Sequence, residues 1–223
     1  MMKQIFVTGT DTGVGKTVVS RALLQKLTEG NKNTVGYKPV AKSSQQTEMG
    51  PRNKDALVLQ SSSSLQLPYA AINPYTVLDD EVSTSQDICI DYAVLSSGLK
   101  ALAVQSDHVV VEGTGGWRSL MSDLRPLSEW VVEERLPVVM VVGIKLGCLS
   151  HAILTAEAIV NDGLPLLGWV ANRINPGLAH YAEIIEVLSS KLQAPLLGEL
   201  PYLPRAETRD LAKYLDLTPL NLA

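Results

Sequence analysis

Residues 5–24 read IFVTGTDTGVGKTVVSRALL, and this stretch decides the fold. An apolar, β-branched run leads into a glycine-rich turn, and Lys16 and Thr17 then open a pattern typical of an amphipathic helix that ends near Gly30. In this order, the backbone N–H groups of the turn and the positive end of the helix dipole surround phosphate oxygens. The stretch therefore predicts a phosphate loop from Gly9 to Thr17 that binds a nucleoside triphosphate.

The loop differs from the usual motif in its spacing. Five residues separate Gly9 from Gly15, whereas the usual motif has four. We expect Lys16 to reach the terminal phosphates and the Thr17 hydroxyl to bind Mg²⁺. The alternative is a glycine turn that only joins a strand to a helix. The agreement of both flanking elements with the motif favours the phosphate loop.

Further apolar, β-branched runs alternate with helical patterns along the rest of the chain. Most of these runs do not alternate with polar residues, which is typical of parallel strands covered on both faces. The alternation predicts right-handed crossovers and a doubly wound, mostly parallel α/β sheet of the P-loop nucleoside triphosphate hydrolase type. The expected strands are 5–8, 34–40, 109–112, 138–142, 167–172 and 196–200, and the expected later helices are 92–104, 127–134, 151–161 and 181–192.

The composition favours one aliphatic α/β domain over residues 1–223. Hydrophobic residues make up 46% of the chain, and with one Phe present the core must be mainly Val, Leu, Ile and Ala. The net charge of −4 argues against nucleic acid as the main partner. The chain has only two cysteines and no signal-peptide pattern, which favours the cytoplasm. It has no apolar run of the roughly 20 residues that a membrane helix needs, so we expect no membrane span.

Residues 41–85 are an exception to this alternation. They are rich in Ser, Gln, Asn and Pro, include four consecutive serines at 61–64, and show only a modest helical patch at 56–60. We expect long loops here that belong to the active site, because a stretch of this length in a compact domain is usually functional or disordered.

Three charged residues are candidates for the chemistry beside the phosphates. Glu112 follows a buried strand and is a candidate Mg²⁺ ligand, or alternatively a cap for the amides of 113–116. Asp55 is a second candidate metal ligand, or the N-cap of a short helix. Lys38, in GYKPV, could stabilise charge during phosphoryl transfer, or be a surface lysine at a strand end.

Six blocks of sequence resemble the dethiobiotin synthetase family, in order and over nearly the whole chain. They are GTDTGVGKT, GYKPV, the Asn-x-Asp-Ala of 53–56, VEGTGGW, VVGIKLGCLSHA and GWVANRINP. The longer glycine spacing is also a feature of that family. The resemblance implies an ATP-dependent cyclo-ligase of biotin biosynthesis. In that reaction 7,8-diaminopelargonic acid takes up CO₂ as a carbamate, ATP phosphorylates it, and the second amine closes the ureido ring, giving dethiobiotin, ADP and phosphate.

The resemblance also implies roles for particular residues. Lys38 and Lys16 would be catalytic, and Thr17, Asp55 and Glu112 would contact Mg²⁺. A homodimer is implied, in which the substrate carboxylate binds at the subunit interface; by sequence alone the segment after Ile144 could equally be an ordinary turn. The implied nucleotide contacts are Gly13, Val14, Gly15, Lys16, Thr17, Val18, Asp55, Glu112, Gly113, Thr114, Gly115, Asn172, Arg173, Pro201, Tyr202, Leu203 and either Glu207 or Thr208. The implied substrate contacts are Thr12, Lys38, Lys42, Leu146, Gly147 and Cys148.

Two positions depart from the family pattern. Gly13 stands where an acidic residue is expected, and Lys42 stands where a serine that contacts the substrate is expected. An ammonium beside the diamine would disfavour a charged amine, so Lys42 could change the affinity or the substrate, although Ser43 or Ser44 could supply a hydroxyl. A diverged synthetase acting on a different amine or carboxylate is therefore one alternative.

Two other classes share this scaffold. An amidoligase often needs an ammonia source, and this chain has no room for a glutaminase domain. A partitioning or assembly ATPase, switched by ATP, is expected to carry an extra lysine near the start of its phosphate loop, and residues 10–13 contain none.

Overall fold

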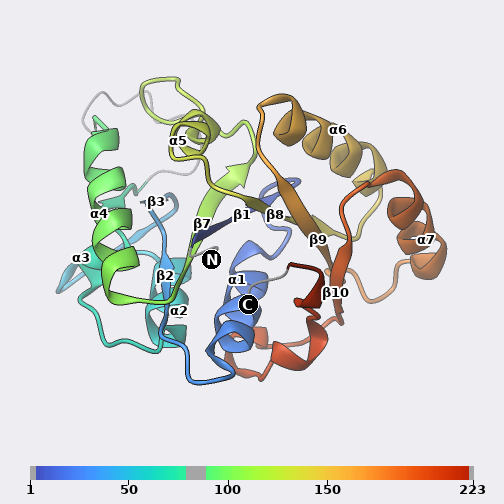
Figure 1. The fold of residues 1–223 in the computed structure, drawn as a ribbon, viewed down its shortest axis with the longest axis horizontal. Coiled ribbons are helices and arrows are strands. Elements are labelled where there is room, and N and C mark those ends of the chain that lie inside the picture. Colours follow the sequence, from blue (N-terminus) through green and yellow to red (C-terminus); the bar gives the residue numbers. More distant parts are fainter. Residues whose placement is uncertain (1–3, 79–88, 221–223) are drawn as a thin grey trace.

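The computed structural model describes residues 4–78 and 89–220, and its centre is a six-stranded parallel sheet (Figure 1). The strand order is β10-β9-β8-β1-β7-β2, and every neighbouring pair is parallel. The strands are β1 (Gln4–Gly9), β2 (Thr34–Tyr37), β7 (His108–Gly116), β8 (Val138–Gly143), β9 (Leu166–Asn172) and β10 (Leu196–Leu200). The doubly wound parallel sheet predicted from the sequence is confirmed.

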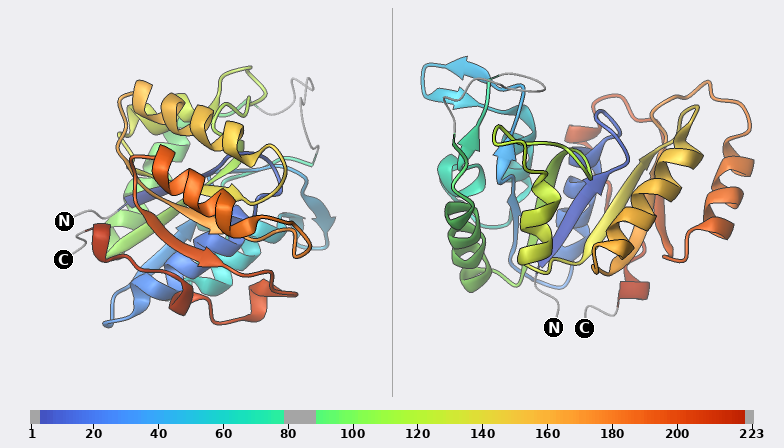
Figure 2. Two further views of the ribbon diagram at one scale, coloured as in Figure 1. Left: turned by 90° about the vertical axis from the view of Figure 1, so that its right-hand side faces the viewer. Right: turned by 90° about the horizontal axis from the view of Figure 1, so that it is seen from above.

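Helices cover both faces of the sheet (Figure 2). The helix α1 (Lys16–Thr28) lies on one face, and the other face carries α4 (Tyr92–Gln105), α5 (Leu127–Glu133), α6 (Cys148–Asn161) and α7 (Tyr181–Lys191). The strands are buried because both faces are covered, which explains their continuous apolar runs.

The arrangement of the crossovers opens a crevice at one edge of the sheet. The neighbouring strands β1 and β7 are followed by connections on opposite faces, so the chain diverges at their carboxyl ends. Val7 of β1 pairs with Glu112 of β7, and the register shifts before Gly9 pairs with Gly116. Both the glycine-rich turn and Glu112 therefore lie at the place where ligands bind in open α/β sheets.

The expectation of long loops over residues 41–85 is wrong for most of the part that the structure describes, whereas the helical patch expected at 56–60 is confirmed. Residues 79–85 of that stretch lie outside the described residues. The predicted strand 34–40 also ends at Tyr37, and a short strand follows Pro39. This region contains β3 (Val40–Ala41), β4 (Gln45–Thr47), β5 (Gly50–Arg52), α2 (Lys54–Ser62), α3 (Tyr69–Ile72) and β6 (Tyr75–Thr76). These elements are short, and side-chain hydrogen bonds rather than apolar periodicity define them.

The serine run has a structural role in this region. Ser63 Oγ accepts from the backbone N–H of Gly36 at 2.9 Å, and Ser64 Oγ accepts from that of Thr34 at 2.8 Å. Both oxygens accept from β2, which is one of the two edge strands of the sheet, so the serines occupy donors that would otherwise be free to pair with another strand.

The chain returns to α1 after β10. The segment contains three short 3-10 helices, η1 (Ala206–Thr208), η2 (Ala212–Tyr214) and η3 (Thr218–Leu220). Arg21 and Gln25 of α1 both donate side-chain hydrogen bonds to the carbonyl oxygen of Arg209, at 3.2 and 3.1 Å. In the part of the chain that the structure describes, no helix is long and apolar enough to cross a membrane.

Candidate active site

The phosphate loop has a geometry that requires glycine at Gly15. This residue has φ 90°, and a Cβ there would lie 2.0 Å from Nδ2 of Asn172. The same Asn172 nitrogen donates to the carbonyl oxygen of Val14 at 2.9 Å. The loop is therefore held from the end of β9, and a side chain at Gly15 would break that contact.

Lys16 begins α1 and turns back over the loop. Its Nζ donates to the carbonyl oxygen of Asp11 at 3.1 Å, and the residue is 8% exposed. Burial and the neighbouring charge of Lys38 lower the pKa of Lys16 to about 8. An anion bound in the loop would oppose both causes and favour the charged form.

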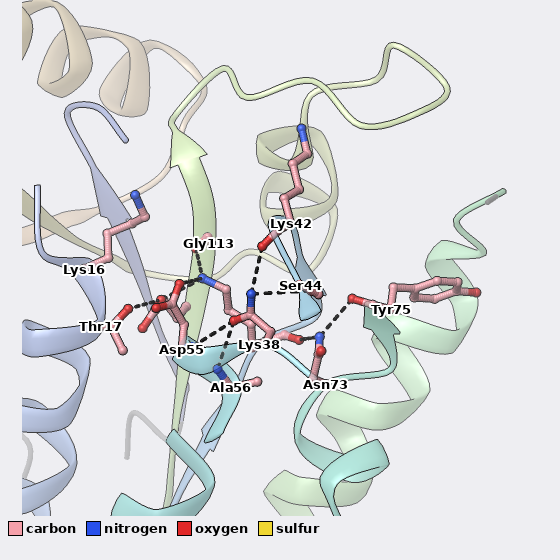
Figure 3. Close-up of polar contacts among 12 residues, drawn as sticks. Lys16, Thr17, Lys38, Lys42, Ser44, Asp55, Ala56, Asn73, Tyr75 and Gly113 are labelled. Atoms are coloured by element: carbon pink, nitrogen blue, oxygen red, sulfur yellow. Dashed lines mark hydrogen bonds and ion pairs between the residues drawn. The ribbon is translucent and has the colours of Figure 1, made fainter. Parts of the chain in front are cut away.

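Lys38 is the centre of a buried charge cluster at the end of β2 (Figure 3). Its Nζ lies 2.7 Å from Oε1 of Glu112, 2.9 Å from the carbonyl oxygen of Gly113 and 3.4 Å from Oδ2 of Asp55. Burial opposes its charge, but the carboxylates of Glu112 and Asp55 outweigh burial and hold the pKa of Lys38 above its usual value. Lys38 is 2% exposed, so the alternative of a surface lysine is wrong.

Glu112 joins this cluster to the phosphate loop. Its Oε1 also accepts from Thr17 Oγ1 at 2.9 Å, whereas its Oε2 is buried without a hydrogen-bond partner. No backbone amide of residues 113–116 donates to this carboxylate. The alternative that Glu112 caps these amides is therefore wrong. A fully buried carboxylate oxygen without a partner is costly, and such an atom points to a ligand.

Asp55 lies in the first turn of α2 and is not its cap. The N-cap is Asn53, whose Oδ1 accepts from the backbone N–H groups of Asp55 and Ala56 at 2.9 and 3.2 Å. The alternative of Asp55 as N-cap is therefore wrong, and its carboxylate is left to face Lys38.

The donor set fits Mg²⁺ as the sequence predicts. The Thr17 hydroxyl and the carboxylates of Asp55 and Glu112 converge on one place, and Glu112 Oε2 has no protein partner there. Mg²⁺ is commonly bound by one or two carboxylates together with phosphate oxygens. Among the described residues no group of three or more His, Cys, Asp and Glu side chains could hold a metal alone.

A cavity of about 890 Å³ lies over the phosphate loop and this cluster. Lys16, Thr17, Lys38 and Asp55 line it together, and Glu112 lies directly beneath them. Other predicted residues that line the cavity are Thr12, Gly13, Gly15, Val18, Lys42, Thr114, Gly115 and Glu207. Of the two late candidates, Glu207 lines the cavity, whereas Thr208 donates its hydroxyl to the carbonyl oxygen of Arg205.

Some of the residues predicted to contact the nucleotide or the substrate do not line this cavity. Arg173 stacks on the ring of Tyr181, 4.8 Å from its centroid. Val14 is buried in the core. The remaining members of this group are Gly113, Asn172, Pro201, Tyr202, Leu203, Leu146, Gly147 and Cys148.

Sequence reasoning missed several residues of the cavity wall. Trp117, Arg118, Ser119 and Leu120 follow β7, and the VEGTGGW block placed only their neighbours in the site. The other missed residues are Arg21, Asn53, Lys54, Val58, Leu154, Thr155 and Ala158, whereas Ser43, named above as a possible source of the hydroxyl, also lines the cavity. The residues of α6 in this group lie on one face of a helix whose apolar pattern does not distinguish a cavity wall from a core.

One ion pair at the loop was also missed. Lys145 Nζ lies 2.7 Å from Oδ2 of Asp11. This contact and the hydrogen bond from the Thr12 amide outweigh burial, which acts in the opposite direction, and hold the pKa of Asp11 below its usual value. The ion pair connects the phosphate loop with the segment before α6. The two residues are 134 positions apart, so no local pattern could pair them.

A phosphate loop at the carboxyl edge of a doubly wound parallel sheet defines a P-loop nucleoside triphosphatase. Solved structures of this class share the fold. The septum site-determining protein MinD of Pyrococcus horikoshii, complexed with Mg-ADP, matches at a TM-score of 0.59 and 16% identity over 96% of this chain and 93% of that one. A ParA family ATPase from Chlorobium tepidum matches at 0.56 and 13% identity over 98% and 93%. The sequence model of the AAA domain family matches residues 3–209.

The chain belongs to the ATP-dependent dethiobiotin synthetase family. It is 68% identical to ATP-dependent dethiobiotin synthetase BioD 2 of Salmonella typhi over 99% of this chain and 96% of the relative. Identity to BioD 2 of Escherichia coli strain K12 is 66% over 99% and 96%, and to BioD of Vibrio cholerae 54% over 99% and 97%.

Proposed function

We propose that this chain is an ATP-dependent dethiobiotin synthetase, a ligase that closes the ureido ring of dethiobiotin. The substrates are 7,8-diaminopelargonic acid, CO₂ and ATP, and the products are dethiobiotin, ADP and phosphate. The observation that carries the proposal is one cavity in which the phosphate loop meets the Lys38–Glu112–Asp55 cluster, in a chain 68% identical to a named synthetase.

The reaction has three steps. An amine nitrogen bonds the carbon of CO₂ and loses a proton to solvent, which leaves a carbamate. A carbamate oxygen takes the γ-phosphoryl group of ATP, and ADP leaves. The second amine then attacks the carbamate carbon and loses a proton to solvent, phosphate leaves and the ring closes. No covalent bond to the protein is needed.

The chain's own residues supply charge and position. Lys16 and the loop amides bind the terminal phosphates, and Lys38 places a positive charge where the phosphoryl group moves between two anions. Mg²⁺, when bound by Thr17, Asp55 and Glu112, supplies charge that stabilises the phosphate oxygens. Glu112 also holds Lys38 and Thr17 in place, since its Oε1 bonds both.

We also propose the following substrate, nucleotide and subunit contacts, on the basis of the cavity and of the family to which the chain belongs. Residues 1–223 act as one domain in the cytoplasm. Thr12 and Lys42 contact the substrate from within the chain, and two chains form a homodimer in which Leu146, Gly147 and Cys148 approach the substrate carboxylate across the interface. The nucleotide is held by the phosphate loop from Gly13 to Val18, by 113–115 after β7, and at its base end by Asn172, Arg173, 201–203 and Glu207.

The test is release of ADP by the purified protein. We expect ADP release to require the diamine, bicarbonate, Mg²⁺ and ATP together, and EDTA to abolish it. ADP release at the same rate with and without the diamine would contradict the proposal and favour an ATPase switched by ATP.

Lys38→Ala separates catalysis from binding. We expect kcat to fall by about a hundredfold or more, while the KM for ATP changes by less than about threefold, because Lys38 lies outside the phosphate loop. Lys16→Ala should abolish turnover and weaken ATP binding as well. An unchanged kcat in Lys38→Ala would refute the role given to this residue.

A further inference from the structure

Lys38 is held through its main chain as well as through its ammonium. Its backbone N–H donates to the carbonyl oxygen of Ile72 at 2.8 Å, and its carbonyl oxygen accepts from Nδ2 of Asn73 at 2.7 Å. Ile72 is the last residue of α3 and Asn73 is its C-cap, so both partners lie at the end of this short helix; Figure 3 shows Asn73 beside Lys38. The position of the Lys38 Cα, and therefore the reach of its side chain, depends on the end of α3.

Asn73 uses every hydrogen bond that its amide can make. Its Nδ2 also donates to the carbonyl oxygen of Tyr75 at 2.9 Å. Its Oδ1 accepts from the hydroxyls of Tyr69 and Thr76, both at 2.8 Å. The residue is 3% exposed, so no water replaces a lost partner easily, and a fully satisfied buried amide of this kind has one orientation.

Tyr69 extends this network to the helix that carries Asp55. Its hydroxyl oxygen accepts from the backbone N–H of Asn53 at 2.8 Å, and Asn53 is the residue that caps α2. The guanidinium of Arg52 covers the Tyr69 ring, 4.3 Å from its centroid. One hydroxyl therefore bridges the start of α2 and the amide that holds Lys38.

We propose that Tyr69 and Asn73 are positioning residues that set the contact between Lys38 and Asp55. The ammonium and the carboxylate are 3.4 Å apart, and their two backbones are joined by the path Lys38, Asn73, Tyr69 and Asn53. Neither Tyr69 nor Asn73 lines the cavity, so their effect on the reaction passes through Lys38 and Asp55. The expected effect on turnover rests on the proposed function. The separation of Lys38 Nζ and Asp55 Oδ2 does not, because it is a property of the fold.

Two variants test this, at saturating Mg²⁺. Tyr69→Phe removes a single oxygen, and Asn73→Ala removes the whole amide. We expect each to lower kcat by about tenfold and to leave the KM for ATP within about twofold, since the phosphate loop lies outside the network. Ser106→Ala is the matched control, because it loses a buried hydroxyl that bonds only the carbonyl oxygen of Leu102, at the far end of α4.

A double-mutant comparison separates positioning from stability. In a Lys38→Ala background we expect Tyr69→Phe to change the residual rate by less than about twofold, because the residue it positions is absent. The same tenfold loss in both backgrounds would mean that Tyr69 serves only the stability of the fold, and would overturn the proposal. An unchanged kcat in Tyr69→Phe would overturn it too.

A crystal structure of Tyr69→Phe gives a readout that does not depend on turnover. We expect the separation of Lys38 Nζ and Asp55 Oδ2 to lengthen clearly beyond 3.4 Å. An unchanged separation would overturn the proposal. If the unmodified protein showed no diamine-dependent ADP release, the proposed function would fail, and this distance would still decide whether Tyr69 positions Lys38.

Discussion

Gly15 shows how one residue can decide whether the nucleotide site forms. Its φ of 90° already disfavours a side chain, and the close approach of Asn172 leaves no room for one. We expect Gly15→Ala to lose measurable ATP binding in titration calorimetry, because either the loop or Asn172 must move. Gly30→Ala is the control, since Gly30 has φ 87° and open space around its Cα.

Both glycine variants carry a backbone penalty of about 1 kcal/mol in the free energy of unfolding. Gly30→Ala should retain ATP affinity while its melting temperature falls. Equal ATP affinity in Gly15→Ala would show that the loop tolerates a Cβ, and would contradict the geometry given for this turn.

Lys42 is the residue most able to alter the choice of substrate. It lines the cavity, and its Nζ donates to the carbonyl oxygen of Leu120 at 2.7 Å, across the cavity from β3. Its charge opposes binding of a protonated diamine, so we expect Lys42→Ser to lower the KM for the diamine by roughly threefold to tenfold. Steady-state kinetics at saturating ATP would measure this change.

Lys32→Ser is the control for Lys42, because it removes an equal charge from an exposed position outside the cavity. A higher KM in Lys42→Ser would mean that the lysine helps to bind the substrate instead of repelling it.

The sequence predicted which charged residues meet in the site better than it predicted the residues around them. Lys16, Thr17, Lys38, Asp55 and Glu112 come together as expected, because each follows a strand or opens a helix at one edge of the sheet. Lys145 could not be found in the same way. Its partner Asp11 is distant in the chain, and neither residue has a spacing that indicates the other.

The edge strand β2 depends on the serine run that follows α2. Ser63→Ala leaves the Gly36 N–H buried without its acceptor, so we expect the free energy of unfolding to fall by about 1–3 kcal/mol. Denaturant titration would measure the loss.

Ser61→Ala is the matched control within the same run. The Ser61 hydroxyl is exposed and bonds only the carbonyl oxygen of Val58, so its removal should cost less than about 0.5 kcal/mol. Equal losses in the two variants would mean that β2 does not depend on Ser63.

The elements around Ser63 were also the hardest to predict. The long strands and helices have apolar periodicity, and all six strands of the central sheet were located within a few residues. The short elements between Val40 and Thr76 have no such period. Asn53, Asn73 and the serines define them through side-chain bonds to backbone groups of Lys42, Lys38 and β2, and a composition rich in such residues also describes a loop.

The proposed homodimer gives a prediction for the whole molecule. Leu146 is 87% exposed and begins the segment that we place at the interface. We expect Leu146→Asp to sediment as a single chain where the unmodified protein sediments as two, because a carboxylate buried in that interface would have no partner.

Val104→Asp is the control for Leu146, since Val104 is also 87% exposed but lies near the end of α4. Its mass in solution should be unchanged. A Leu146→Asp protein that still sediments as two chains would place the interface elsewhere.

The return of the chain to α1 after β10 has a consequence for the order in which the enzyme is built. Glu207 lines the nucleotide cavity, and Arg209 is bonded to two side chains of the helix that the phosphate loop begins. A ribosome will therefore have made all six strands and the whole phosphate loop before it makes Glu207. A growing chain that stops at Leu200 has the loop that binds phosphate, but it lacks Glu207 and the segment that holds it against α1.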